Sequence, residues 1–84
     1  ILLTTIDLTE DWQGWRASEI EEVLESEEDW EGGDLPLERS EYGTVRVPAR
    51  QLRDPGIFQE DGQTYLLYSV AGEQGIGIAK LHRV

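Results

Sequence analysis

The last third of the chain is the part of the sequence that most restricts the fold. Three runs rich in aromatic, β-branched or other apolar residues cover residues 54–60, 63–71 and 76–83. Asp61-Gly62 separates the first two runs, and this dipeptide suits a two-residue hairpin turn in which both residues take positive φ angles. The run Gly72-Glu73-Gln74-Gly75 marks a second turn. The spacing predicts a three-stranded antiparallel meander over residues 54–84.

The first 26 residues leave two conformations open. Residues 1–8 are rich in β-branched and apolar types, which predicts a strand, and a turn follows at residues 9–14. Residues 15–26 fit a helix, since Ser18 and Glu21 match a capping box, but they also fit a poor strand. The local pattern favours the helix slightly. We nevertheless expect a strand pair over residues 1–26 rather than a strand plus a helix, because of a family resemblance described below.

The middle of the chain, residues 27–53, shows no sustained hydrophobic period and is interrupted by several Gly and Pro residues. It is long for a loop of a compact domain, where unstructured segments beyond about 12–15 residues are usually functional or disordered. We expect an irregular crossover that contains one short strand at residues 44–47. The predicted fold is therefore a single, mainly β domain, an antiparallel meander with a long irregular crossover.

Length and composition limit the core and the chemistry. A chain of 84 residues forms one small domain and buries only about 60–65% of the surface that it exposes when unfolded. It has no cysteine, which excludes disulfides and thiolate metal sites, and no apolar run long enough for a membrane span. The chain lacks Met and begins at Ile1, so it is either processed or a piece of a longer protein. We expect a cytoplasmic protein.

The charge of the chain is concentrated in its first half. There are 18 acidic and 7 basic residues, a net charge of −11, and residues 1–41 hold 14 of the acids against 2 of the bases. The second half is close to neutral. Nucleic acids and anionic membranes are therefore not expected as partners. A solvated surface is the simpler explanation of the acidic half, and a basic partner surface is the alternative.

Several motifs recur in a recognisable order along the chain. The most specific are Leu52-Arg53-Asp54-Pro55-Gly56-Ile57-Phe58, Glu60-Asp61-Gly62, residues 64–73 and Gly75-Ile76-Gly77-Ile78-Ala79. Weaker ones are Ile6-Asp7-Leu8, Asp11-Trp12, Trp15, Ala17-Ser18-Glu19, Val23-Leu24 and Trp30-Glu31-Gly32. Together they resemble the final blade of bacterial proteins similar to family-43 glycoside hydrolases.

This resemblance implies a five-bladed β-propeller whose funnel binds sugars and whose carboxylates hydrolyse glycosidic bonds, one protonating the leaving oxygen while another activates water. Five blades do not fit into 84 residues. The chain would therefore supply an incomplete propeller blade, without the earlier blades that hold most of the family's catalytic acids.

One functional motif, Arg53-Asp54-Pro55, is carried over from the resemblance, and it lies where the innermost strand meets the funnel. Asp54 precedes a proline, which favours an extended backbone. The start of the first strand and the end of the second share one end of a meander, so Glu73 is expected near Arg53 and Asp54. We take these three as candidate sugar-binding residues, against the simpler role of carboxylates that bond to local backbone. The catalytic residues stay unassigned.

The third run carries a row of small residues on one face, namely Gly75, Gly77 and Ala79. Glycine weakens a strand, so such a row indicates that another structure packs very close to it. In a propeller that structure is the neighbouring blade. An isolated meander is expected to have no use for the row.

Other residues are weaker candidates. His82, the sole histidine, has no nucleophile pattern around it, and we expect it in solvent. A group of acids offers oxygen ligands for Ca²⁺ but lacks the spacing of an EF-hand loop. Its members are Glu27, Glu28, Asp29, Glu31 and Asp34. The tryptophans, Trp12, Trp15 and Trp30, are expected in the core rather than as stacking platforms for sugars. We expect no cofactor and no metal.

Three functions remain from the sequence. The first is a truncated glycoside-hydrolase-like propeller fragment, without catalysis on its own, which forms a homo-oligomer because a missing fourth strand leaves an open sheet edge. The second is a carbohydrate-binding or glycosidase subunit that is completed by oligomerisation. The third is an acidic protein-interaction module that docks on a basic protein. We expect a homo-oligomer with a carbohydrate as the possible ligand.

Overall fold

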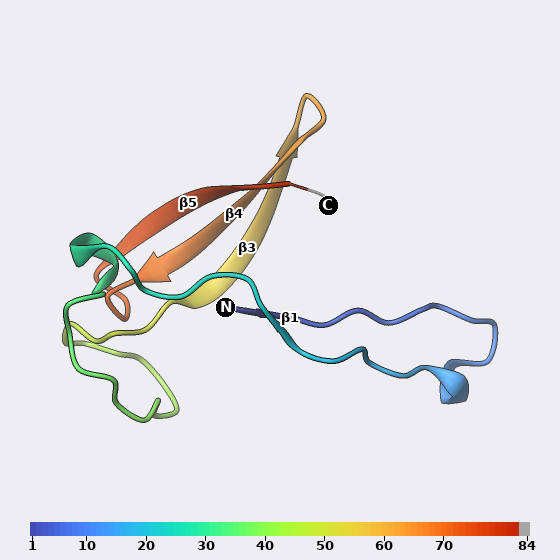
Figure 1. The fold of residues 1–84 in the computed structure, drawn as a ribbon, viewed down its shortest axis with the longest axis horizontal. Helices are drawn as coiled ribbons and strands as arrows, with labels where there is room; N and C mark the ends of the chain where they lie inside the picture. The colour runs from blue at the N-terminus through green and yellow to red at the C-terminus, as the bar shows by residue number, and fades with distance from the viewer. Residues whose placement is uncertain (83–84) are drawn as a thin grey trace.

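The computed structural model describes residues 1–82 and shows a mainly β protein with two antiparallel sheets (Figure 1). The strands are β1 (Leu2–Leu3), β2 (Glu21–Glu22), β3 (Arg53–Glu60), β4 (Gln63–Val70) and β5 (Gly75–Leu81). Two short 3-10 helices, η1 (Trp12–Gly14) and η2 (Asp29–Glu31), are the only helical elements of the described residues. The predicted fold class is confirmed.

The larger sheet is the predicted meander, with strand order β3-β4-β5. Asp61 and Gly62 turn the chain between β3 and β4 with φ angles of 49° and 74°, as the hairpin signal requires. A second turn, at Ala71 and Gly72, also uses positive φ angles and leads into β5. Residues 83–84, which we assigned to the meander, lie outside the described residues.

One face of this sheet carries the small hydrophobic core. Leu66, Tyr68 and Val70 of β4 are buried, and five partly buried side chains pack against them. These are Ile1, Leu24, Leu52, Ala79 and Leu81. Gly77 lies directly opposite Tyr68, and a Cβ atom on this glycine would stand 2.7 Å from the tyrosine ring. Our expectation that an isolated meander has no use for its small residues is therefore wrong, because Gly77 makes room for a ring of the same sheet.

The opposite face of the meander, here called the outer face, has no cover. Strand alternation places Phe58, Tyr65, Leu67, Ile76 and Ile78 on this side, away from the core. Phe58, Ile76 and Ile78 are 50%, 79% and 61% exposed. The rings of Phe58 and Tyr65 are neighbours, with centroids 6.4 Å apart. The outer face therefore exposes an apolar centre to water, and Lys80, Ser69, Glu60 and Gln63 lie on the same face around it.

Residues 2–22, here called the N-terminal arm, form a long hairpin that projects away from the meander (Figure 1). β1 pairs with β2 near the body, and an isolated bridge joins Ile6 to Ala17 further out. Residues 15–26 contain no helix, so the strand pair that we adopted describes them better than the helix that the local pattern favours. The arm makes the molecule elongated, with a radius of gyration of 15.2 Å against about 12 Å for a compact chain of this length.

The crossover from residue 27 to residue 52 is irregular apart from η2. The short strand that we predicted at residues 44–47 is absent, so this prediction is wrong. The backbone N–H of Val45 donates a hydrogen bond to the Glu73 carboxylate and not to the carbonyl of a neighbouring strand. The backbone N–H of Ala49 donates to the carbonyl of Ala71 at 3.1 Å. The crossover is thus held by the β4–β5 turn. None of the helices in residues 1–82 has the length and apolar character needed to cross a membrane.

Substituting Gly77 tests how tightly the core face is packed. Gly77→Ala places a methyl group against the Tyr68 ring, so we expect the free energy of unfolding to fall by about 1–3 kcal/mol, although alanine normally suits a strand better than glycine. Urea denaturation followed by tryptophan fluorescence measures the change. Gly56→Ala is the matched control, because a Cβ atom there has no neighbour within 4 Å. Equal stability of both variants would contradict the close contact.

Candidate functional site

The first candidate site lies where β3 begins. Arg53 pairs with Ser69, and the register of the ladder then shifts before Gly56, which marks a β-bulge. Asp54 occupies the bulge with a φ angle of 50°, so the extended backbone that we expected for it before Pro55 is wrong. The bulge leaves the Asp54 side chain exposed, and its carboxylate accepts a long hydrogen bond of 3.5 Å from the Ser69 hydroxyl.

The side chain of Arg53 is half-buried beside this bulge. Its Nη1 atom is buried and has no hydrogen-bond partner among the described residues. A buried donor without an acceptor costs about 1–3 kcal/mol or more when the group is charged. Arg53 therefore has an unused donor next to the exposed carboxylate of Asp54.

Glu73 lies in the β4–β5 turn, at the same end of the meander as Arg53 and Asp54, as predicted from the strand order. Its carboxylate accepts the hydrogen bond from the backbone N–H of Val45, with 2.5 Å between the two atoms. The three candidate residues thus share one end of the sheet, but the carboxylates of Asp54 and Glu73 bond to Ser69 and Val45 rather than to Arg53. Their role in sugar binding stays a prediction.

A buried acid–phenol pair, which the sequence did not reveal, lies close to this end. Glu31 is only 4% exposed, and its Oε2 atom accepts a hydrogen bond of 3.0 Å from the hydroxyl of Tyr68. Its Oε1 atom accepts from the backbone N–H groups of Glu27 and Glu28 at 3.3 and 3.1 Å. Burial above all, and then the hydrogen bond and negative charge of Glu31, raise the pKa of Tyr68 from 10.0 to about 12.

Glu31 also joins three segments through its backbone. Its carbonyl accepts a hydrogen bond of 3.0 Å from the N–H of Ala71, so one residue ties η2 to β4 and to the β4–β5 turn. Gly32 follows with a φ angle of 86°, and a Cβ atom there would lie 2.7 Å from the carbonyl oxygen of Ala49. The close approach of the crossover therefore requires glycine. The two glycines that follow Glu31, Gly32-Gly33, were the sequence signal that could have indicated close packing of the chain at this acid.

The acids around η2 do not form a cation site within the part of the chain that the structure describes. No three His, Asp or Glu side chains of residues 1–82 gather in a way that would hold a metal ion. Glu31 points into the protein and both of its carboxyl oxygens already accept hydrogen bonds. The remaining acids of this group are exposed on the surface, namely Glu27, Glu28, Asp29 and Asp34.

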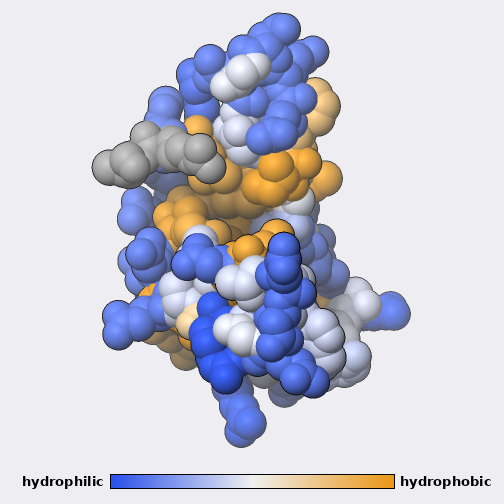
Figure 2. All heavy atoms as spheres, turned by 90° about the vertical axis from the view of Figure 1, so that its right-hand side faces the viewer, coloured by the Kyte–Doolittle hydropathy of each residue, from blue (hydrophilic) through white to orange (hydrophobic). Residues whose placement is uncertain are grey.

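Two hollows border the base of the arm. The larger has a volume of about 1250 Å³ and is lined by Leu2, Leu3 and Val23 of the first segment and by Ile57, Leu66 and Leu81 of the meander, with His82 at its edge. Figure 2 shows hydrophobic side chains gathered in this hollow, between the β3–β4 hairpin and the arm that points at the viewer. Its openness and apolar lining suit packing against another structure.

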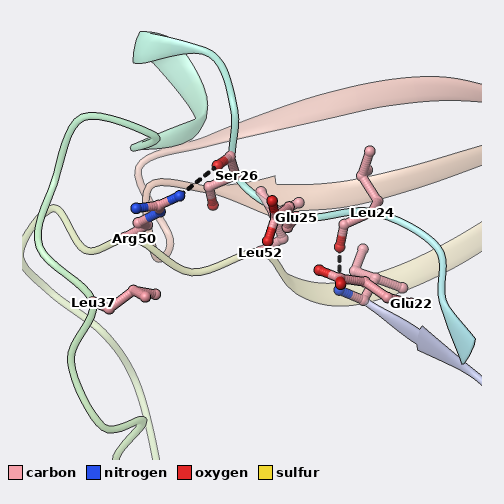
Figure 3. A pocket seen from close by; sticks show the side chains of 8 residues that line it. Glu22, Leu24, Glu25, Ser26, Leu37, Arg50 and Leu52 are labelled. Carbon is pink, nitrogen blue, oxygen red and sulfur yellow. Dashed lines mark hydrogen bonds between the residues drawn. The ribbon is translucent and has the colours of Figure 1, made fainter. Parts of the chain in front are cut away.

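The smaller hollow, of about 240 Å³, is shown in Figure 3. Leu24, Leu37 and Leu52 supply apolar walls. Two hydrogen bonds close it: the ammonium of Ile1 donates to the Leu24 carbonyl at 2.6 Å, and the guanidinium of Arg50 donates to the Ser26 carbonyl at 3.5 Å. The first bond holds Ile1 against Leu24, and the second holds the crossover against Ser26.

Comparison with known proteins adds one relative. No protein-family model and no solved structure matches the chain. An uncharacterized protein of Acanthamoeba polyphaga mimivirus is 44% identical over 82 residues, which is 96% of this chain and 23% of that protein. The chain thus spans about a quarter of the length of the curated relative that it matches.

Removal of the Tyr68 hydroxyl tests the buried pair. Tyr68→Phe leaves Oε2 of Glu31 without its donor in a buried position, so we expect the free energy of unfolding at neutral pH to fall by about 1–3 kcal/mol. Urea denaturation measures the difference. Tyr42→Phe, at a fully exposed tyrosine, is the control and should leave stability unchanged.

The same pair predicts a pH dependence. Because the pKa of Tyr68 is raised in the folded protein, its contribution is complete below pH 10, where the unfolded chain also keeps the proton, and is lost as the pH rises to about 12. We expect the stability advantage of the wild type over Tyr68→Phe to shrink across this range by an amount on the order of 2 kcal/mol. A difference that stayed constant at high pH would argue against the raised pKa.

Proposed function

We propose that this chain is a sheet module of the kind found in glycoside-hydrolase-like propellers, without catalysis on its own, that associates with copies of itself. The observation that carries the proposal is the uncovered outer face of β3–β5, with Phe58, Ile76 and Ile78 largely in water. The largest apolar patch of a soluble monomer, typically about 300–600 Å², is often a functional contact surface. Covering this face removes the cost of its hydration.

The size of the outer face limits how strong the association is. Three strands about 4.8 Å apart, each with seven or eight residues at about 3.3 Å, make a face of roughly 350 Å². A stable interface usually covers about 800 Å² on each partner. Face-to-face packing alone therefore gives a weak complex, and pairing at the open edges of β3 and β5 strengthens it. We expect association that depends on protein concentration.

The proposed lack of catalysis is supported by what the carboxylates near the sheet end already do. Glu31 is buried and bonded to Tyr68, and Glu73 is bonded to the backbone of Val45. Glycoside hydrolysis requires two carboxylates that face one substrate, about 5–10 Å apart. In the mimiviral relative the matching segment is 23% of the protein, so further chain adjoins it there.

A charge placed on the outer face tests the self-association. Ile78→Lys puts an ammonium group at the centre of the proposed contact, so we expect the complex to dissociate to monomer, as measured by size-exclusion chromatography with light scattering over a concentration series. Lysine is chosen because it lowers the net negative charge, so general repulsion between chains cannot explain dissociation. Tyr42→Lys is the matched control, because Tyr42 is fully exposed on the crossover. A wild type that stays monomeric up to millimolar concentration would remove the proposal.

A second candidate function is carbohydrate binding by Arg53, Asp54 and Glu73. The observation that favours it is the exposed carboxylate of Asp54, which makes only a long hydrogen bond to Ser69 and is carried by an uncommon left-handed backbone. Such conformations concentrate at binding sites, where the surrounding structure holds them. A sugar hydroxyl that donates to Asp54 and accepts from the accessible part of the half-buried Arg53 guanidinium, rather than from its buried Nη1 atom, would form charge-assisted hydrogen bonds with both residues.

Glycan-array binding of the full chain, followed by calorimetry on any glycan that binds, tests this second function. We expect Arg53→Met and Asp54→Asn to weaken binding by about 10–100-fold each, since each removes a charge-assisted hydrogen bond. Asparagine tolerates the left-handed backbone, so the fold is kept. Arg39→Met serves as the control on the exposed crossover. Absence of any bound glycan would remove this function and leave the self-association proposal untouched.

A further inference from the structure

The end of the N-terminal arm, residues 7–16 and here called the arm tip, presents large apolar side chains to solvent. Leu8 is 76% exposed and Trp12 is 70% exposed. The tip lies far from the meander (Figure 1), and within residues 1–82 these two side chains stay largely in solvent. Our expectation that the tryptophans belong to the core is therefore wrong, since Trp15 and Trp30 are also 40% and 55% exposed. Exposed tryptophan at the end of a projecting element is the side chain that most often dominates a protein–protein contact.

The backbone of the arm tip is already ordered without a partner. Asp11 begins η1 and its carboxylate accepts from the N–H of Gln13 at 3.0 Å, while its carbonyl accepts from Gly14 at 3.0 Å. The indole N–H of Trp15 donates to the carbonyl of Thr9 at 3.0 Å and closes the loop. A surface that is rigid before binding loses little conformational entropy when it docks.

The charge of the arm selects the kind of partner. The arm carries six acids and one base, and Asp7, Glu10 and Asp11 belong to the tip. The one base, Arg16, uses its guanidinium to donate to the carbonyls of Gln13 and Trp15 at 3.0 and 2.8 Å. The carboxylates of the tip therefore meet no cation of the arm. Docking of two arms onto each other is opposed by like charge, and a basic surface is favoured.

We propose that the arm tip is a docking knob for a second protein whose surface has an apolar pocket bordered by Lys and Arg. Trp12 and Leu8 fill the pocket, and Asp7, Glu10 and Asp11 face its basic border. The knob is separate from the outer face: the neutral, apolar sheet receives a copy of the same chain, while the acidic arm receives a different protein. The inference therefore does not depend on self-association.

A phage-displayed library of random linear peptides, selected on the full wild-type chain and counter-selected on Trp12→Ala, tests the knob. We expect the enriched peptides to combine Lys or Arg with aromatic or leucine residues. Calorimetry on the synthesised peptides should show binding at least about tenfold weaker with Trp12→Ala, which removes the central side chain, and weaker at high salt. Trp30→Ala, which removes a tryptophan that lies outside the arm and is 55% exposed, should bind like the wild type.

Three results would overturn the proposal. They are the absence of any peptide that prefers the wild type to Trp12→Ala, enrichment of peptides without basic residues, and equal loss of binding in Trp30→Ala. The circular dichroism spectrum of Trp12→Ala should match that of the wild type, which would exclude unfolding as the cause of weaker binding. We expect this because the hydrogen bonds of Asp11 and Trp15 that order the tip do not use the Trp12 side chain. Ile78→Lys keeps the arm intact and should keep full peptide affinity, so a loss there would show that the knob and the outer face are one surface.

Discussion

The hydrogen bond between Tyr68 and Glu31 is the constraint on which the rest of the structure depends. It joins residues 37 positions apart and fixes the crossover against the centre of the meander. The core has only three buried apolar side chains, and Tyr68 is one of them. A carboxylate in such a core is tolerated because all its oxygens accept hydrogen bonds, and its removal would leave buried groups unpaired. In this small core, the hydrogen bonds of Glu31 therefore hold segments together that further apolar side chains would hold in a larger protein.

The local parts of the fold could be predicted from the sequence, and the parts set by distant contacts could not. Asp61-Gly62 and the apolar runs beside it determine the hairpin through their own backbone preferences. The segment around Ser18 favours a helix locally, but pairing with the first strand through the Ile6–Ala17 bridge overrides that preference. The absent strand at residues 44–47 shows the same effect, because a carboxylate from Glu73 competes for a backbone donor that sequence patterns assign to a sheet.

In the candidate site, too, only part of the arrangement could be predicted from the sequence. Strand order alone was enough to place Arg53, Asp54 and Glu73 at one end of the meander. Their partners were beyond reach of the sequence, since the bulge that turns Asp54 outward arises from a register shift between two strands. The burial of Glu31 was missed for a related reason, because an acidic segment with this net charge reads as a solvated surface. Only the contact with Tyr68 in the structure reveals that one carboxylate of this segment, that of Glu31, lies in the interior.

The bulge at the start of β3 also limits how copies of this sheet can grow. A regular edge strand offers a row of donors and acceptors to which further strands add without end, as in fibres. Here the ladder is broken between Arg53 and Gly56, and Pro55 has no N–H to offer. Lys80 of the other edge strand lies opposite Tyr65 on the outer face, so its ammonium group has to stay at the margin of any face-to-face contact. The bulge and Pro55 thus leave only part of the β3 edge free for pairing with another strand, which favours small, finite assemblies over continued strand addition.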